Sequence, residues 1–368
     1  MSPPGAPVVP GPSSFEGAAA AVAPLDEAAM AAAAAHQDRL TKPRGSLGRL
    51  EAAGTQLAGI SGRCPPPVPS PAAVAVFAGD HGVVAEGVTP WPAEVTAQMV
   101  ANFCSGGAAI NVLARHVGAQ VLVVDVGVAA ELDAAPGLRL AKVRPGTANL
   151  AVEPAMTVAE TRAALDVGAA VAADLVAGGA RCLVTGDMGI GNTTPSAALI
   201  AAFTNRPAPD VTGRGTGIDD AMWARKVAVV EQALARTRAA GVAPGRDPLD
   251  ALASLGGLEI AAVAGFVVGG AAARVPVIVD GVIACAGLLA ARALVPGCSG
   301  YCFAGHRSVE PGAGAALAQL GLAPMLDLDL RLGEGTGACL ALPVLQAAAK
   351  VLSEMATFDS AGVTEKDA

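Results

Sequence analysis

Two glycine-rich segments contain residue types that could do chemistry. The first is residues 186–194, Gly-Asp-Met-Gly-Ile-Gly-Asn-Thr-Thr, between a strand-like run and a helix-like run. Its free backbone N–H groups and its threonine hydroxyls predict a phosphate cradle, which the dipole of the following helix would strengthen. The segment is not a P-loop, because the Lys-Ser/Thr ending is missing, and its glycine spacing does not match a dinucleotide fingerprint. A tight turn without a ligand is the alternative interpretation.

The second segment is residues 333–337, Gly-Glu-Gly-Thr-Gly, which surrounds Glu334 with glycines. Glycine adopts backbone angles that other residues avoid, so the chain can approach a ligand closely there. The segment follows the alternating apolar run of residues 325–332, and α/β proteins place their sites after such strands. Glu334 is therefore a candidate site residue, and a solvated turn residue is the alternative.

Two further glycine-rich loops lie elsewhere in the chain. Residues 213–217 (Gly-Arg-Gly-Thr-Gly) precede Lys226, and residues 305–308 lead to Gly312. Lys226 could act on a phosphate as a point charge, or it could be an exposed lysine on a helix. Three such loops on one edge of a sheet favour a phosphorylated ligand more strongly than any single loop does.

A parallel sheet is needed to position these loops together. Short apolar runs alternate with longer helical patterns, which predicts a sheet covered by helices on both faces. Ligands in such folds bind outside the carboxyl ends of the strands, and each Gly/Asp/Ser cluster falls at such an end. The predicted strands are residues 72–78, 120–126, 181–185, 275–279, 299–304 and 326–330, and the predicted helices include residues 93–116, 157–177 and one that starts near Pro195.

The composition narrows the class of protein. Of 368 residues, 53% are apolar and 15% are charged, which supports a sizeable core and as many as two domains. The net charge of −8 argues against nucleic acid as a partner, because no basic stripe is available to meet phosphates. Seven scattered cysteines indicate reduced thiols and a cytoplasmic location. No targeting segment is visible, and the apolar run at residues 260–273 is too short to span a membrane.

The N-terminal region differs from the centre of the chain. Residues 1–17 are rich in Pro, Ser and Gly, which predicts a disordered tail. Residues 18–36 predict a helix that breaks at Pro24, with Asp26 as a candidate cap. A proline-rich loop at residues 63–71 predicts a linker between a helical piece and the main domain.

Five segments together resemble the nicotinate-nucleotide–dimethylbenzimidazole phosphoribosyltransferase family, whose members make the lower-ligand nucleotide of cobalamin. The resemblance extends from about residue 40 to residue 358, in the family's order. No single motif is specific, but the joint match is. The segments are residues 41–51 (Thr-Lys-Pro-Arg-Gly-Ser-Leu-Gly-Arg-Leu-Glu), 78–88 (Ala-Gly-Asp-His-Gly-Val-Val-Ala-Glu-Gly-Val), 186–194, 213–217 and 331–338.

The resemblance implies a reaction and a catalytic residue. A ring nitrogen of 5,6-dimethylbenzimidazole would displace nicotinate from C1 of nicotinate mononucleotide, giving α-ribazole 5'-phosphate and nicotinate. The pyridinium departs as a neutral ring nitrogen and needs no acid, whereas the incoming azole must lose a proton. Glu334 matches the family's catalytic glutamate. In an apolar pocket its raised pKa would make it a better base, and its charge could stabilise a ribosyl cation.

The resemblance also implies substrate contacts. Asp187 departs from the glutamate that is usual in the family's motif, and one methylene less puts its contact in doubt. Met99 and Val100 are assigned to the core. The implied contacts are the phosphate cradle of Gly189, Gly191, Asn192 and Thr193, the phosphate-site residues Lys226, Ser308 and Gly312, and, at the benzimidazole, Thr89 and Gln98 downstream of the substrate-site residues Asp80 and His81.

The pattern and the resemblance together predict a three-layer α/β/α domain with a parallel, Rossmann-like sheet at residues 68–334. The resemblance adds a small helical domain built from both chain ends, residues 18–62 and 335–360, and a homodimer. It implies no metal or organic cofactor; Cys298, Cys302 and His306 are spaced like part of a metal site but have no fourth ligand nearby. Two alternatives stay open, namely transfer to another base such as adenine or a phenolic compound, and a nucleotide-binding sensor without catalysis.

Overall fold

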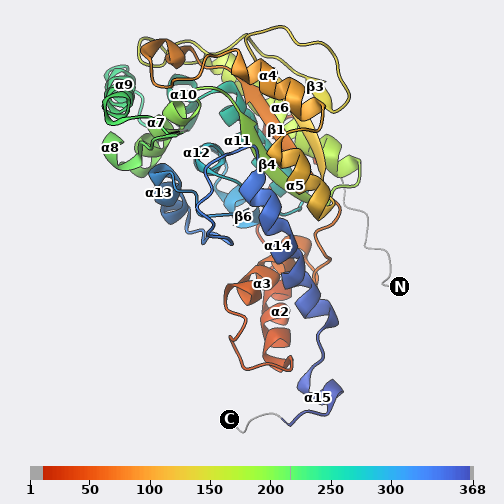
Figure 1. Ribbon diagram of the computed structural model, residues 1–368. Coiled ribbons are helices and arrows are strands. Elements are labelled where there is room, and N and C mark those ends of the chain that lie inside the picture. Colours follow the sequence, from red (N-terminus) through yellow and green to blue (C-terminus); the bar gives the residue numbers. More distant parts are fainter. Residues whose placement is uncertain (1–10, 216, 365–368) are drawn as a thin grey trace.

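A six-stranded parallel sheet forms the centre of the computed structural model, which describes residues 11–215 and 217–364 (Figure 1). The strands lie in the order β3-β2-β1-β4-β5-β6, and all neighbours are parallel. The order reverses between β1 and β4, which is where such sheets open a crevice for ligands. The strands are β1 (Ala72–Gly79), β2 (Gln120–Gly127), β3 (Leu138–Leu140), β4 (Cys182–Met188), β5 (Val277–Val279) and β6 (Cys302–Ala304).

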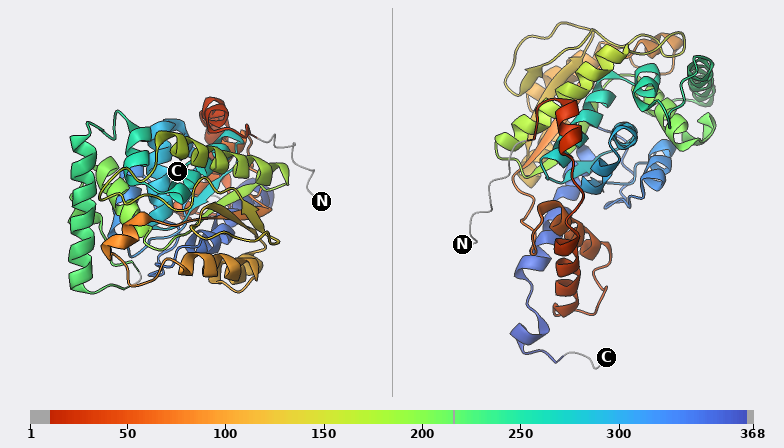
Figure 2. Two further views of the ribbon diagram at one scale, coloured as in Figure 1. Left: turned by 90° about the horizontal axis from the view of Figure 1, so that it is seen from above. Right: turned by 180° about the vertical axis from the view of Figure 1, so that it is seen from behind.

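Helices cover both faces of the sheet, so the predicted three-layer architecture is confirmed. Helices α4, α5 and α14 pack on one face, and α11 and α12 pack on the other, with α6 lying against α11. Figure 1 views the first face and the right-hand part of Figure 2 views the second. The helices are α1 (Phe15–Ala21), α2 (Glu27–Arg39), α3 (Arg49–Ser61), η1 (Gly82–Glu86), α4 (Val95–Cys104), α5 (Ala109–Val117), α6 (Val158–Ala177), α7 (Thr193–Thr204), α8 (Ala208–Val211), α9 (Asp220–Ala239), α10 (Pro248–Leu255), α11 (Leu258–Ala272), α12 (Val282–Leu294), η2 (Pro296–Tyr301), α13 (Pro311–Leu320), α14 (Thr336–Glu354) and α15 (Phe358–Ala361).

Small residues set the distance between the layers. All eight residues of β1 are buried, and the strand is mostly alanine, valine and glycine. The helices α6 and α11 approach so closely that a Cβ atom on Gly168 would lie 1.9 Å from the carbonyl oxygen of Ala262. A core with few aromatic residues therefore reaches close packing by bringing backbones together.

A small helical unit lies beside the sheet domain. It contains α2, α3, α15 and the second half of α14, around a cluster of Ala29, Ala33, Ala58 and Leu352. The backbone of Leu40 pairs with that of Thr357, so segments from the two ends of the chain lie side by side. Figure 1 shows α14 running from the sheet into this unit, so the two parts share this helix.

Two features of the predicted domain organisation differ in the structure. Helix α1 packs against α6 and α11, and Ala18 is fully buried there, so residues 15–21 lie on the sheet domain and not in the small unit. The predicted disorder is wrong for residues 15–17, because Phe15 begins α1 and its N–H donates to Asp166 Oδ1 at 2.8 Å. The predicted disorder of residues 1–10 lies outside the described residues. The first half of α14 also packs on the sheet domain, against α5, β4 and β5.

Most predicted elements are present, and the exceptions have local causes. The helix predicted at residues 93–116 is two helices, because the chain turns at Gly106 with a φ of +77°. Half of the strand predicted at residues 299–304 is the 3₁₀ helix η2. The strand predicted at residues 326–330 is wrong: only Leu326 pairs with the sheet, at His306, and Asp329 has a φ of +53°, which ends any extended run. The short edge strand β3 was not predicted.

Among the residues that the structure describes, one helix has the length and composition to cross a membrane, namely α14 at residues 336–354. Of its apolar window, 56% is buried inside the protein. Its apolar residues are therefore largely explained by packing against the sheet and the small helical unit.

Candidate active site

A cavity of about 400 Å³ lies at the carboxyl ends of β4, β5 and β6, beside the first turns of α4. The segments that follow these three strands meet there, as expected for a ligand site at the carboxyl ends of parallel strands. The cavity is lined by Trp91, Val95, Met99, Asp187–Ile190, Asn192, Thr193, Gly215, Gly281–Ile283, His306, Ser308, Glu310 and Arg331–Glu334.

Glu334 lines this cavity from a turn of unusual backbone conformation. Gly333, Glu334 and Gly335 all have positive φ, at +82°, +63° and +93°. Glu334 is 6% exposed, and its Oε2 accepts the N–H of Ile110 at 3.2 Å, in the first turn of α5. Its carboxylate therefore lies at the positive end of a helix dipole.

The surroundings of Glu334 make it a stronger base than an exposed glutamate. Burial raises the pKa of the Glu334 carboxyl above its usual range, and the negative charge of Asp280 raises it further. The N–H of Ile110 opposes this shift. A carboxylate held at the wall of a largely apolar cavity has the character that general-base catalysis requires.

The glycine-rich loop after β4 folds partly on itself. The N–H of Asn192 donates to the oxygen of Gly189 at 3.1 Å, and the N–H of Ile190 donates to Thr96 Oγ1 at 3.1 Å. The loop therefore offers fewer free N–H groups than its glycines suggested. Gly189 also has a packing role, because a Cβ there would lie 2.3 Å from the oxygen of Gly79. Gly191 provides a φ of +88° that leads into α7.

A buried lysine supplies the positive charge beside this loop. Lys226 is 1% exposed, and its Nζ donates to Thr193 Oγ1 at 2.7 Å. Burial lowers the pKa of Lys226 to about 8, while the nearby charge of Glu310 acts in the opposite direction. Glu310 Oε1 in turn accepts the N–H of Gly215 at 2.8 Å. The interpretation of Lys226 as an exposed lysine is therefore wrong.

Carboxylates gather behind Glu334. Asp187 is 4% exposed, and its Oδ2 accepts the side-chain amide of Asn192 at 3.1 Å. Burial, together with the charges of Asp280, Glu259 and Glu334, raises the pKa of Asp187 well above its usual range. This shift favours the protonated, neutral form of Asp187.

Of the remaining predicted site residues, some line the cavity and others lie outside its lining. Ser308 lines the cavity, and its Oγ accepts the N–H of Glu310 at 3.3 Å. Gly312 lies in α13, where a Cβ would meet the oxygen of Val211 at 2.7 Å, so it serves helix packing. Thr89 and Gln98 do not line the cavity; the Thr89 hydroxyl accepts the N–H of Trp91, and Gln98 is exposed.

Asp80 and His81 also lie outside the cavity lining. His81 Nε2 lies 2.8 Å from Glu259 Oε1, and both side chains are buried. Burial lowers the pKa of His81, but Glu259 outweighs this effect and raises it overall. Asp80 Oδ2 accepts the N–H of Ala129 at 2.7 Å. Both residues thus hold the end of β1 against its neighbours.

Several cavity residues were not predicted. Met99 had been assigned to the core and lines the cavity, together with Trp91. Asp280, Glu310 and Arg331 also lie at or next to it. Asp280 could have been noticed, because it follows a predicted strand directly, and Arg331 lies in the segment of residues 331–338 that carries part of the resemblance; Glu310 has no sequence signal. Among the described residues, no group of three or more His, Cys, Asp or Glu is arranged to hold a metal.

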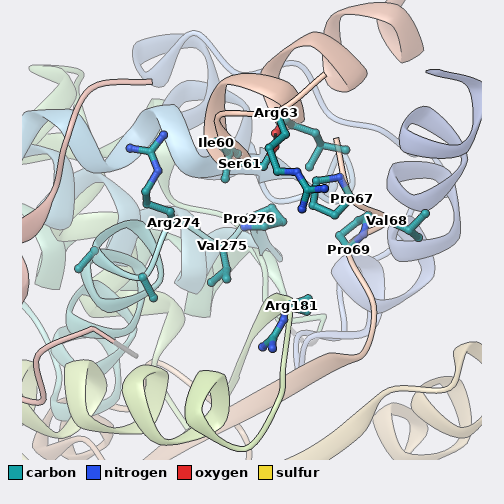
Figure 3. A pocket seen from close by; sticks show the side chains of 13 residues that line it. Ile60, Ser61, Arg63, Pro67, Val68, Pro69, Arg181, Arg274, Val275 and Pro276 are labelled. Carbon is teal, nitrogen blue, oxygen red and sulfur yellow. Dashed lines mark hydrogen bonds between the residues drawn. The ribbon is translucent and has the colours of Figure 1, made fainter. Parts of the chain in front are cut away.

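A second cavity, of about 340 Å³, lies at the junction of the two parts of the chain (Figure 3). It is lined mainly by apolar residues of α3, of the proline-rich linker and of residues 272–276, with Arg63, Arg181 and Arg274 around it. Its described lining contains no carboxylate. It lies near the start of β4 and β5, away from the loops with the reactive groups, so it is not the candidate active site.

Comparison with known proteins identifies the family of this chain. A family model described as phosphoribosyltransferase matches residues 22–363. The chain belongs to this phosphoribosyltransferase family.

Individual relatives and solved structures extend the match over almost the whole chain. A nicotinate-nucleotide–dimethylbenzimidazole phosphoribosyltransferase of Salinispora tropica is 57% identical over 366 residues, covering 96% of this chain and 100% of the relative. One of Roseiflexus sp. is 55% identical, covering 94% and 97%. The crystal structure of the enzyme of that name from Thermus thermophilus has a TM-score of 0.88 at 49% identity, covering 93% of this chain and 100% of the other. The α/β fold is therefore shared with a solved relative.

Proposed function

We propose that this chain transfers the 5-phosphoribosyl group of nicotinate mononucleotide to 5,6-dimethylbenzimidazole, in assembly of the cobalamin nucleotide loop. The observation that carries the proposal is Glu334, a buried carboxylate of raised pKa at the wall of the cavity. The same cavity is lined by Thr193, whose hydroxyl accepts a hydrogen bond from the buried Lys226. High identity to relatives that carry this enzyme name supports the choice of substrates.

The reaction can be written so that every bond and proton is placed. The glycosidic bond from C1 to the nicotinate nitrogen breaks, and its electron pair stays on nicotinate, which leaves as a neutral ring nitrogen. A ring nitrogen of the benzimidazole forms the new bond to C1, and the other ring nitrogen gives its proton to Glu334. In this proposal the negative charge of Glu334 also stabilises the ribosyl cation while the two bonds exchange.

Binding roles follow from the positions of the charged groups. We assign the phosphate to Lys226 and Thr193, with Asn192 and Ser308 beside them at the same cavity. The apolar wall of Trp91, Val95 and Met99 is suited to a flat methylated ring. The residues Gly312, Thr89, Gln98, Asp80 and His81 lie outside the lining of the cavity, so no direct substrate contact is assigned to them.

The experiment that tests the function is turnover with a panel of acceptors. Purified protein is incubated with nicotinate mononucleotide and dimethylbenzimidazole, adenine or a phenol, and the products are identified by mass spectrometry. Release of nicotinate with α-ribazole 5'-phosphate as the preferred product supports the proposal. Preference for another acceptor would change the substrate, and tight binding of nicotinate mononucleotide without any product would favour the sensor alternative.

Two further expectations belong with this function. We expect a homodimer, because two large apolar side chains that line the cavity are exposed, namely Trp91 by 49% and Leu332 by 59%. Light scattering after size exclusion checks it, and a monomer at micromolar concentration would contradict it. We also expect a cytoplasmic location, since all seven cysteines are free thiols.

A further inference from the structure

Asp280 forms an unusual contact with the segment that carries Glu334. It follows β5 directly and is 1% exposed. Its two oxygens accept two backbone N–H groups of the other segment: Oδ2 accepts Gly335 N–H at 3.1 Å, and Oδ1 accepts Ala338 N–H at 2.9 Å. Gly335 is the N-cap of α14, so a carboxylate from β5 caps the helix that begins beside the catalytic candidate.

This cap acts on a turn that local sequence does not stabilise. Glu334 is a non-glycine residue with a φ of +63°, between two glycines that also have positive φ. Such a conformation persists only where the surrounding structure fixes it. Two contacts fix the turn here. The Thr336 hydroxyl donates to the carbonyl oxygen of Gly333 at 2.8 Å, and Asp280 Oδ2 accepts the N–H of Gly335. The flanking residues Gly333 and Gly335 permit positive φ angles, but glycine is too flexible to fix the turn in this conformation.

We propose that Asp280 is a positioning residue for the transfer reaction, which holds the turn at residues 333–335 so that the Glu334 carboxylate points into the cavity. This inference rests on the proposed function. Asp280 does not reach the reacting atoms; it acts through the backbone of α14 and through its charge. That charge is one cause of the raised pKa of Glu334, so removing it is expected to make Glu334 more acidic.

The other groups facing Asp280 define its electrostatic setting. His306 Nδ1, from the end of β6, lies 3.5 Å from Asp280 Oδ1, and Asp187 faces it from the end of β4. The thiols Cys285 of α12 and Cys339 of α14 lie near it, and the charge of Asp280 contributes to their raised pKa values. Burial raises the pKa of Asp280 overall, although His306 and the N–H donors oppose this shift. Both oxygens of Asp280 accept a backbone N–H, which is the arrangement that a charged carboxylate offers.

The test is Asp280→Asn, with Asp125→Asn as a matched control. Asparagine keeps the size but loses the charge and one acceptor. Asp125 is also a buried carboxylate near the end of a strand, and its Oδ1 accepts Val128 N–H at 2.9 Å, outside the cavity lining. We expect Asp280→Asn to lower kcat at least tenfold with little change in KM, and to move the acidic limb of the kcat/KM profile to lower pH. Asp125→Asn should lower the melting temperature but leave the pH profile in place.

A double-mutant cycle separates positioning from general stability. In the Glu334→Gln background, Asp280→Asn should lower kcat by much less than tenfold, because the residue it positions is already lost. If Asp280→Asn does not fold, Asp280→Ser, which keeps one acceptor, is measured in the same way. An unchanged kcat and pH midpoint in a folded Asp280 variant, or fully additive losses, would overturn the role of Asp280. Absence of turnover in the unsubstituted protein would instead refute the proposed function.

Discussion

Glu334→Gln is the substitution with the clearest consequence for the proposed mechanism. Glutamine has the size of glutamate and keeps one oxygen, which can still accept the N–H of Ile110. The backbone at residues 333–335 is held by Asp280 and by the Thr336 hydroxyl through bonds that do not involve the Glu334 side chain. We therefore expect a folded protein that binds both substrates and cannot accept the azole proton.

The size of the defect follows from the role of the carboxylate. Loss of a general base costs about 10²–10⁴ in rate, which corresponds to roughly 2.7–5.5 kcal/mol in the barrier. Lost stabilisation of the ribosyl cation would add to this. Because the side chain acts in the transition state, the loss should appear in kcat while KM stays near that of the unsubstituted protein.

The pH dependence provides a second readout. Burial raises the pKa of Glu334, so kcat/KM of the unsubstituted protein should fall as the pH drops through a midpoint above 4.5. The stabilising contribution of such a group is present below the pKa of the unfolded chain and is lost as the pH rises through the folded pKa. Glu334→Gln should therefore lack the acidic limb of activity, and above that midpoint it should be at least as stable as the unsubstituted protein.

The assay is single-turnover release of nicotinate, with folding checked by circular dichroism and binding by calorimetry. An acceptor whose N–H ionises more readily than that of dimethylbenzimidazole should partly restore the rate, since less proton abstraction is needed. A kcat close to normal in a well-folded variant would remove Glu334 from the mechanism. Asp187 and Glu310 would then be the remaining carboxylates of the cavity lining, because Asp80 does not line the cavity.

Three further predictions concern other parts of the chain. Lys226→Ala should weaken nicotinate mononucleotide binding by about 10–100-fold and leave dimethylbenzimidazole binding unchanged. Because the pKa of Lys226 is about 8, affinity in the unsubstituted protein should fall as the pH rises through that value, and calorimetry of Lys226→Ala should show no such slope. Asp187→Glu should keep activity within about tenfold; a collapse of turnover with the fold intact would mean that the site has repacked around the shorter acid. Gly168→Ala should destabilise the protein by about 3 kcal/mol in chemical denaturation, since the new methyl group would lie 1.9 Å from the oxygen of Ala262; a wild-type midpoint would contradict the close packing of α6 on α11.

Local patterns in the sequence were enough to locate the central strands of the sheet. The run at residues 72–78 is apolar on both faces, as buried parallel strands require, and it forms β1. Thr157, which was predicted to open the helix of residues 157–177, caps α6 with its side chain. The glycines around Glu334 indicated a strained turn near a ligand, and all three residues there have positive φ. These features depend on neighbours in sequence, so they could be predicted.

The same patterns failed where neighbours in sequence do not decide the outcome. Residues 326–330 alternate like a strand, but Leu328 is 56% exposed and Asp329 has positive φ, so the alternation does not reflect burial. Lys226 could have been a surface lysine by its sequence, but Thr193, Gly215 and Glu310 lie beside it in the folded chain. A single helical pattern cannot show which loop will cover it.

The sequence determined which residues could react, because glycine, carboxylate and lysine chemistry is a property of residue type. The tertiary structure decided which of them meet. Asp280 and Gly335 are hydrogen-bonded although 55 residues separate them, and Glu334 reaches Ile110 across 224 residues. These contacts form because α5 and α14 both pack on the sheet that contains β5. The pKa of Glu334 is therefore set by burial and by charges that no single segment of the chain contains.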